Sequence, residues 1–352
     1  MTRIEGNTTL STLKITILKY LNNYRACTTE QLIQVSRSYT PAYLQKVLTQ
    51  LRKAKLIKSK TLVGSRKQVK GFSYHQITTA GAELLALHEG RENVGINDTY
   101  LPTALLHQVL LANDILMNLR SHNWSVLDSR KAKAFYSIDR RTQLQGMIQS
   151  EVGEPYGIYV MNERVLATTV GKIQSEMMEN RMKICRYMIF AKGGASYQHF
   201  LNKALQTERI DKNGRVTTMS PLYTGQPLKI FPMKLGISWL LKYPSEWLWY
   251  NALVDTFEMT LESTDQEHPH FNVPVTYNGR SYFLVSFVDT DLLTLRYIET
   301  YNDSEFNRYK RKLLVVTVLT AQTDLLKGLH DKVEVLQLLG QQMRQLIHGE
   351  AE

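Results

Sequence analysis

Acidic residues are absent from one long stretch of this 352-residue chain. Positions 31–82 contain no Asp or Glu but ten cationic residues: Arg37, Lys46, Arg52, Lys53, Lys55, Lys58, Lys60, Arg66, Lys67 and Lys70. The formal net charge of the chain is +11, so these ten residues leave only about +1 for everything outside the stretch. A surface that serves only solubility mixes both signs of charge. Positive charge alone over some fifty residues instead predicts a polyanionic partner, with nucleic acid favoured over anionic lipid.

Cysteine and long apolar runs are also scarce. Cys27 and Cys185 are the only cysteines, and their separation offers neither a zinc-binding spacing nor a disulfide framework, which fits a reducing compartment. The most apolar run, residues 313–319, is far shorter than a membrane span and is interrupted by Thr317. Residues 1–9 are polar and do not resemble a secretion signal. We therefore expect a cytoplasmic protein that does not associate with a membrane.

The basic stretch has the apolar periodicity of a folded domain. Apolar residues recur at helical spacing over residues 10–21, and a short second helix is expected after Thr28 or Thr29. Residues 36–38 form a turn, after which Thr40 and Pro41 have the character of an N-cap and a first helical position. The third helix then presents an apolar stripe to the core, made of Leu44, Val47, Leu48 and Leu51.

A hairpin and a fourth helix complete the domain that we predict over residues 1–90. Residues 56–63 and 69–77 have strand character and are separated by the turn sequence Gly-Ser-Arg-Lys at 64–67. A helix from Thr78 to Leu87 should pack back on the first helix. This order of helices and strands is that of an α+β winged helix-turn-helix, in which the third helix enters the major groove and the hairpin contacts the backbone or minor groove.

The candidate contacts to double-stranded DNA fall into two groups. Residues around the start of the third helix would contact bases or phosphates: Arg37, Ser38, Tyr39, Thr40, Ala42, Tyr43, Gln45 and Lys46. Residues on the flank and wing would contact phosphates and add affinity without sequence information: Arg52, Lys53, Lys58, Arg66, Lys67 and Lys70. Two structural alternatives stay open: Tyr39 and Tyr43 pack against the second helix, or the basic face is merely solvated.

The rest of the chain predicts a linker and a mixed α/β body. Residues 91–102 are polar and rich in turn formers, and we assign the body to residues 103–352. Two β-α-β stretches on either side of residues 211–226 suggest a subdivision there. An amphipathic helix is expected over residues 325–347, either in the core or as a dimer contact. A homodimer, or a complex with another replication or transfer protein, is therefore anticipated.

Three segments resemble the replication-relaxation family of plasmids and other mobile elements. They are the helix-turn-helix from Thr28 to Leu56, the sequence YHQITTAGAELL at the end of the hairpin, and the helix LLHQVLLANDIL, which contains His107 and Asp114. The resemblance covers about the first 120 residues and implies a restriction-endonuclease-like fold for the body. Such nucleases hold a metal with carboxylates beside a lysine. This chain has no Glu-x-Lys or Asp-x-Lys, and Asp289 and Asp291 follow a strand without a neighbouring lysine. We therefore expect a degenerate, noncatalytic copy without metal or cofactor.

These features predict a sequence-specific DNA-binding protein of a mobile element. These features fit three roles equally well: replication control, an accessory function at a transfer origin in conjugation, and transcription regulation. The main alternative is a relaxase or replication initiator that nicks the DNA it binds, with His268 and His270 in a His-x-His metal site; Pro269 and the acidic neighbours instead favour a solvated loop. A third alternative is an interaction adaptor without a role on DNA.

Overall fold

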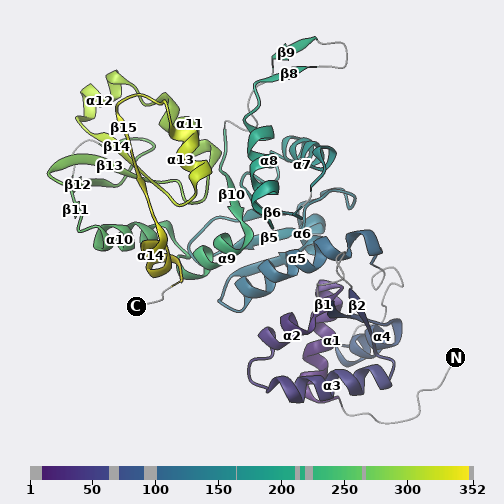
Figure 1. The fold of residues 1–352 in the computed structure, drawn as a ribbon. Coiled ribbons are helices and arrows are strands. Elements are labelled where there is room, and N and C mark those ends of the chain that lie inside the picture. Colours follow the sequence, from purple (N-terminus) through teal and green to yellow (C-terminus); the bar gives the residue numbers. More distant parts are fainter. Residues whose placement is uncertain are drawn as a thin grey trace. The chain divides into compact units, whose positions relative to one another are not determined.

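The computed structural model describes residues 10–62, 71–90, 101–163, 165–210, 215–218, 225–263 and 267–348. The chain divides into two compact units, unit 1 (Met1–Ser121) and unit 2 (His122–Glu352), and both contain helices and strands (Figure 1). None of the described helices is long and apolar enough to cross a membrane.

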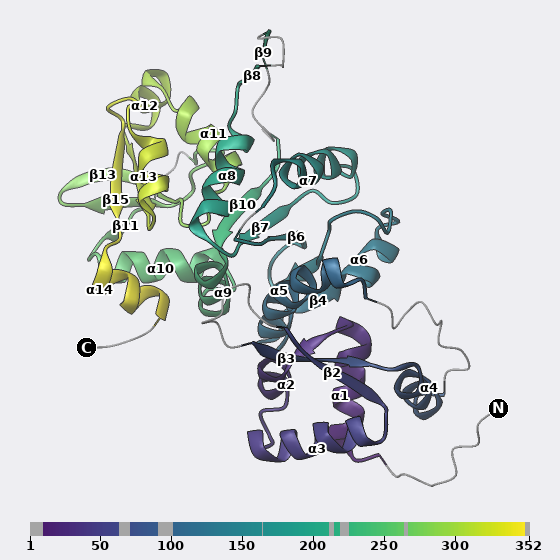
Figure 2. The same cartoon turned by 45° about the vertical axis from the view of Figure 1, so that its right-hand side comes forward.

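Unit 1 contains a bundle of helices around a small sheet. Its elements are α1 (Thr12–Tyr24), β1 (Cys27–Thr28), α2 (Thr29–Val35), α3 (Pro41–Lys53), β2 (Ile57–Leu62), β3 (Phe72–Ile77), α4 (Thr79–His88) and α5 (Thr103–Arg120). The sheet has the order β1-β3-β2 and is antiparallel throughout. Figure 2 shows α3 along one edge of the unit, and α4 packs against α1 as the sequence predicted.

The start and the buried face of α3 confirm the sequence analysis. The hydroxyl of Thr40 accepts a hydrogen bond from the N–H of Tyr43, and Pro41 occupies the first helical turn, where it has no N–H to leave unpaired. The predicted apolar stripe is fully buried, and consists of Leu44, Val47, Leu48 and Leu51. Burial of four branched side chains on one face fixes which face of α3 is left to solvent.

Helix α5 belongs to unit 1, so the predicted domain boundary at residues 91–102 is wrong. The buried side chain of Asn113 donates hydrogen bonds to the carbonyl oxygens of Tyr24 and Ala26, at 3.1 and 2.6 Å. The side chain of Gln31 donates to the carbonyl of Leu110 and to the carboxylate of Asp114. These bonds, with apolar contacts of α5 to the small sheet, extend the first unit to residue 121. Residues 91–100 lie outside the described part of the chain.

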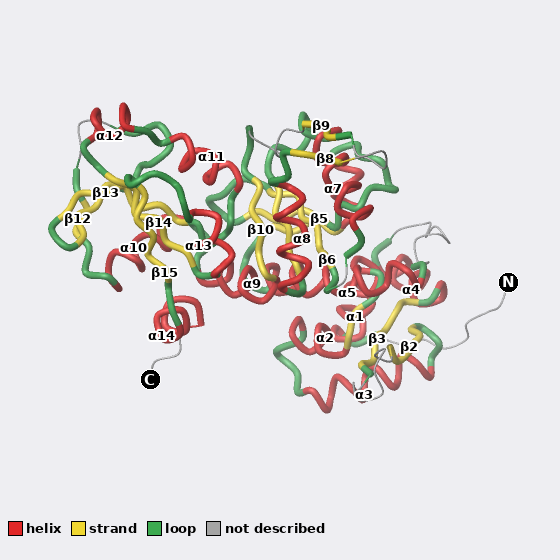
Figure 3. Tube along the Cα trace, turned by 45° about the horizontal axis from the view of Figure 1, so that its top comes forward, coloured by secondary structure: helices red, strands yellow, loops and turns green. Residues whose placement is uncertain are grey.

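Unit 2 contains two five-stranded sheets with the same internal plan. The first has the order β10-β7-β6-β5-β4 and the second β11-β12-β13-β14-β15. In each sheet a meander of three antiparallel strands is followed by two parallel strands, each reached through helices. Figure 3 shows α7 and α8 beside the first sheet and α11 and α13 beside the second.

The elements of the first half of unit 2 are β4 (Ser125–Asp128), α6 (Ser129–Phe135), β5 (Gly146–Gln149), β6 (Tyr156–Met161), α7 (Ala167–Glu179), β7 (Tyr187–Ala191), α8 (Gly194–Ala204), β8 (Glu208–Ile210), β9 (Val216–Thr218) and β10 (Leu228–Pro232). Those of the second half are α9 (Met233–Lys242), α10 (Glu246–Thr256), β11 (Thr260–Leu261), β12 (Pro274–Tyr277), β13 (Arg280–Ser286), α11 (Leu292–Thr300), α12 (Asp303–Tyr309), β14 (Lys312–Thr317), α13 (Thr320–Leu326), β15 (Val333–Gln337) and α14 (Gly340–Met343).

The two sheets meet along the outer edge of β10. The N–H of Ile230 donates to the carbonyl of Asp289 at 2.8 Å, and the N–H of Leu228 donates to the carboxylate of Asp291 at 2.9 Å. One hydrophobic cluster contains side chains from both sheets. The expected subdivision near residues 211–226 is therefore wrong, because β10 follows that segment and completes the first sheet. Residues 211–214 and 219–224 themselves lie outside the described residues.

The helix predicted over residues 325–347 is also wrong. Helix α13 ends at Leu326, and Gly328 follows it with a φ of +81°, a conformation that an ordinary side chain disfavours. The chain then forms β15, which pairs in parallel with β14. The apolar spacing of this segment also suits a helix, but backbone N–H and C=O groups of the strand pair with those of β14. The expected terminal helix is therefore not available as a dimer contact.

Candidate nucleic-acid interface

The described residues that the sequence assigned to DNA contact lie at the surface of unit 1. Every one of them is exposed: Arg37, Ser38, Tyr39, Thr40, Ala42, Tyr43, Gln45, Lys46, Arg52, Lys53 and Lys58. They come from the turn before α3, from the solvent face of α3 and from β2. The remaining three candidates, Arg66, Lys67 and Lys70, lie outside the described residues.

Tyr39 and Tyr43 form an aromatic pair on this surface. Their rings stack with centroids 5.8 Å apart and planes 24° from parallel. The side chains keep 39% and 44% of their surface exposed, so they are not buried against α2. The pair presents one flat apolar face and two hydroxyl groups to solvent, a combination that can contact either bases or sugar and phosphate groups.

The charge of the surface is not compensated locally. Within the part of the chain that the structure describes, Arg37, Lys46, Lys53, Lys58 and Lys60 form no ion pair. Arg52 donates to the hydroxyl of Thr49 at 3.0 Å, which holds its guanidinium along α3. Lys58 and Lys60 alternate with inward residues on β2, the edge strand of the small sheet. Two neighbouring elements, α3 and β2, thus carry exposed cations without ion-pair partners, the kind of charge that binds a phosphate backbone.

His75 is a structural residue of this unit that the sequence analysis did not single out. It is buried on β3, with Nδ1 2.7 Å from the hydroxyl of Ser59 and Nε2 3.0 Å from the hydroxyl of Thr29. Burial, with a smaller contribution from the charge of Arg52, lowers the pKa of His75 to about 4. The neutral imidazole therefore links β2 to the first turn of α2. The sequence pattern offers no signal for this role, because all four residues from Tyr74 to Ile77 are buried and the strand does not alternate there.

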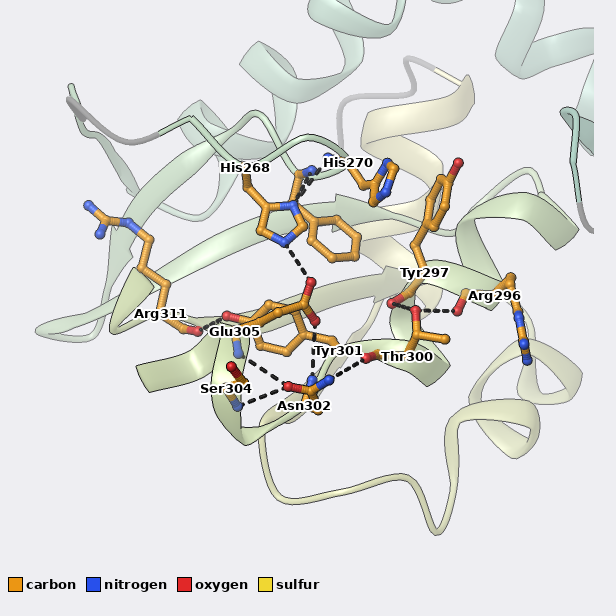
Figure 4. A network of polar contacts seen from close by, with 11 residues as sticks. His268, His270, Arg296, Tyr297, Thr300, Tyr301, Asn302, Ser304, Glu305 and Arg311 are labelled. Atoms are coloured by element: carbon orange, nitrogen blue, oxygen red, sulfur yellow. Dashed lines mark hydrogen bonds and ion pairs between the residues drawn. The ribbon is translucent and has the colours of Figure 1, made fainter. Parts of the chain in front are cut away.

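The His-x-His pair of unit 2 has a different arrangement from that of a metal site. Nδ1 of His268 accepts hydrogen bonds from the N–H groups of His270 and Phe271, and Nε2 lies 3.4 Å from a carboxylate oxygen of Glu305 (Figure 4). The ring of His270 stacks on Tyr297 with centroids 3.6 Å apart. Both nitrogens of the buried His268 thus face protein groups. Among the residues that the structure describes, no group of three His, Cys, Asp or Glu side chains is placed to hold a metal ion.

A lysine does lie beside Asp289, although none is near it in sequence. Nζ of Lys229, on β10, lies 2.9 Å from Oδ2 of Asp289 and 2.7 Å from a carboxylate oxygen of Glu246. Burial alone would lower the pKa of Lys229, but the charges of Asp289 and Glu246 outweigh burial and raise it. The expectation that Asp289 has no lysine beside it holds in the sequence but is wrong in space, because the loop after β13 pairs with the edge of β10.

Comparison of the chain with protein-family models, curated proteins and solved structures gives no match. The resemblance to the replication-relaxation family stays a prediction.

Proposed function

We propose that unit 1 is a winged helix-turn-helix domain that binds double-stranded DNA in a sequence-specific manner. The observation that carries the proposal is the set of exposed cations on α3 and β2, none of which forms an ion pair within the residues that the structure describes. The order of helices and strands in unit 1, with β3 between β1 and β2, supports it. A domain of the same shape that bound only proteins would not require a surface whose charges are all positive.

In this proposal α3 enters the major groove with its N-terminal end toward the bases. Tyr39, Tyr43 and Gln45 provide contacts to base edges, and Lys46 and Arg52 contact phosphates on the flanks of the groove. Lys58 and Lys60 on β2 contact the backbone beside it. Phosphate contacts supply most of the affinity, and the few base contacts supply the sequence preference.

We further propose that the protein acts for a plasmid or other mobile element, in replication control, at a transfer origin or in transcription. Unit 2 would serve as a noncatalytic body of degenerate restriction-endonuclease-like fold. Its role would be dimerisation or recruitment of a replication or transfer protein. The repeated plan of three antiparallel strands followed by two parallel strands is compatible with such a fold. Nδ1 of His268 already accepts two backbone hydrogen bonds, which argues against the nicking alternative.

A salt series tests DNA binding by the full chain. If about five phosphates are contacted, the logarithm of the affinity should fall with the logarithm of salt concentration at a slope of roughly −4 to −5. A variant with Lys46→Ala, Arg52→Ala and Lys58→Ala should lose affinity and reduce the slope by about 2 to 3. The matched control removes three exposed cations of unit 2, by Lys172→Ala, Arg181→Ala and Lys234→Ala, and should behave as wild type. Weak binding that is indifferent to the first set would overturn the proposal.

Sequence preference needs its own measurement. Selection of binding sites from a pool of random duplexes should enrich one motif, and a Gln45→Ala variant should relax the preference at one or two positions of it. Enrichment of no motif would leave only nonspecific binding.

A further inference from the structure

Strand β15 forms an outer edge of the second sheet of unit 2, and its pairing with β14 leaves the backbone groups of alternate residues directed outward. The N–H of Leu313 donates to the carbonyl of Lys332 at 2.9 Å, and the N–H of Leu338 donates to the carbonyl of Thr317 at 2.8 Å. Alternate residues of a strand bond to the same neighbour. The even-numbered residues of β15 therefore bond to β14, and the odd-numbered residues face away from it.

This edge has hydrogen-bonding groups for one further strand. The outward N–H groups of Val335 and Gln337 form no hydrogen bond within the described residues. The N–H of Val333 donates to the carbonyl of His330 at 3.2 Å, so only the carbonyl of Val333 is left for another strand. An edge of this kind is a template for pairing, and native proteins usually protect it by shortness, charge, proline or a covering loop.

The usual protection is present at other edges of unit 2 but not at β15. Strand β11 has only two residues, and the loop of Asp289 and Asp291 covers β10. Strand β15 has five residues, no proline and one charged residue, Glu334. Its carboxylate lies 2.9 Å from Nζ of Lys312 and 2.7 Å from the hydroxyl of Tyr282. The negative charge is thus neutralised within the same sheet and does little to repel an approaching strand.

Apolar side chains accompany the open edge. Val335 is 38% exposed, and Leu339, which follows the strand, is 64% exposed. Leu325, Leu329 and Val333 pack against the hydrophobic cluster of unit 2 but are only partly buried. The apolar core of the second sheet is therefore incompletely covered on the side of β15, and a further strand there would cover it.

The sequence of β15 is suited to pair with itself. In an antiparallel pair with a twofold axis at Val335, this residue lies opposite Val335 of the second copy, and the carbonyl of Val333 accepts from the N–H of Gln337. Glu334 then lies opposite Leu336 of the second copy. A register shifted by one residue would instead place two Glu334 side chains opposite each other, which is unfavourable.

We propose that β15 is a dimer contact, at which two copies of the chain pair antiparallel about Val335 and join their second sheets into one. The partner is a second copy because the edge is complementary to itself in hydrogen bonding and in charge. The inference rests on the dimerisation role proposed for unit 2, but not on DNA binding. If unit 1 binds DNA as proposed, such a twofold dimer reads two half-sites in inverted orientation.

Sedimentation equilibrium of the full chain without DNA, over a series of protein concentrations, tests the proposal. We expect a reversible equilibrium between monomer and dimer. Val335→Lys and Val335→Glu each place two like charges opposite each other, and each should raise the dimer dissociation constant about tenfold or more. An equimolar mixture of the two variants should associate more strongly than either variant alone, because Lys then faces Glu.

The matched controls are Val152→Lys and Val152→Glu, which change an exposed valine of unit 2 outside β15 and should dimerise as wild type. A wild-type chain that stays monomeric at the highest concentration would overturn the proposal, and so would folded Val335 variants that dimerise as wild type. A mixture that associates no better than its components would refute the pairing about Val335. Since DNA is absent, none of these results depends on the function of unit 1.

Hydrogen exchange of the wild-type chain decides if the Val335 variants do not fold. The N–H groups of Val335 and Gln337 should exchange more slowly above the dimer dissociation constant than below it. Those of Glu334 and Leu336, which bond to β14, should change little. Exchange at Val335 and Gln337 that is independent of protein concentration would contradict a dimer through β15.

Discussion

His75 and Ser59 lie directly opposite each other in the β2–β3 pair, and their side chains are joined by a hydrogen bond of 2.7 Å. Burial lowers the pKa of His75 to about 4 in the folded chain. In the unfolded chain this side chain is protonated below about pH 6.5, so between these two pH values only the unfolded chain carries the proton. The contribution of His75 to stability is therefore complete above pH 6.5 and is lost as the pH falls toward 4.

Denaturant unfolding of wild type and of His75→Gln at several pH values should reveal this proton. From pH 7 to pH 5, wild type should lose about 2 kcal/mol more unfolding free energy than the variant, which does not titrate at this position. Parallel pH profiles for the two proteins would contradict the buried, neutral state of His75.

The stacked pair Tyr39 and Tyr43 should affect DNA affinity without changing its salt dependence. Tyr43→Ala removes one ring and a hydroxyl from the surface but no charge, so binding should weaken by roughly 1–3 kcal/mol while the salt slope stays constant. Phe135→Ala, which removes an exposed aromatic ring of unit 2, is the matched control. A change of slope in the Tyr43 variant would mean that the tyrosine orders the basic residues instead of contacting DNA.

Asn113 should be essential for the stability of unit 1. Its amide satisfies the carbonyls of Tyr24 and Ala26, which flank Arg25 at a φ of +66° after α1. Asn113→Ala should cost roughly 1–3 kcal/mol of unfolding free energy, since it leaves a buried acceptor without a donor. Asn113→Asp should cost more because its carboxylate would face the same carbonyls. Unfolding curves equal to wild type for both variants would show that α5 is not part of the unit.

Removal of Lys229 should destabilise unit 2 in a pH-dependent way. Lys229→Met leaves Asp289 buried without its cation, at a cost of roughly 3–5 kcal/mol near neutral pH. Asp289, whose pKa burial already raises, then takes up a proton at lower pH, so the loss should be smaller at pH 5 than at pH 8. The double variant Lys229→Met with Asp289→Asn should lose less than the single variant at pH 8. A loss that is the same at both pH values would contradict the ion pair.

Local signals explain what the sequence could predict. The cap at Thr40, Pro41 in the first turn and the spacing of four leucine and valine residues define α3 without reference to the rest of the chain. The exposed cations of α3 and β2 follow from the same spacing. The described candidate residues are exposed, as that spacing predicts, and their contact with DNA stays a proposal.

Long-range pairing explains what the sequence could not predict. Residues 333–337 have apolar spacing that also suits a helix, and only the neighbouring strand β14 makes them a strand. Lys229 and Asp289 meet because β10 ends one sheet and the loop after β13 covers its edge. The apolar residues of α5 predict a helix but do not say which unit it packs on, and the contacts of Asn113 that join it to unit 1 leave no periodic signal.

The loop of Asp289 and Asp291 has a consequence for how this protein can be divided. It supplies an acceptor to each of two N–H groups on the outer edge of β10, a row that would otherwise be open to another chain. The two halves of unit 2 repeat one plan, yet the first half without the second would present a bare strand edge and a half-covered apolar core. Each half thus covers surface of the other that would otherwise be exposed. Fragments cut between the two halves should therefore aggregate rather than fold as independent domains.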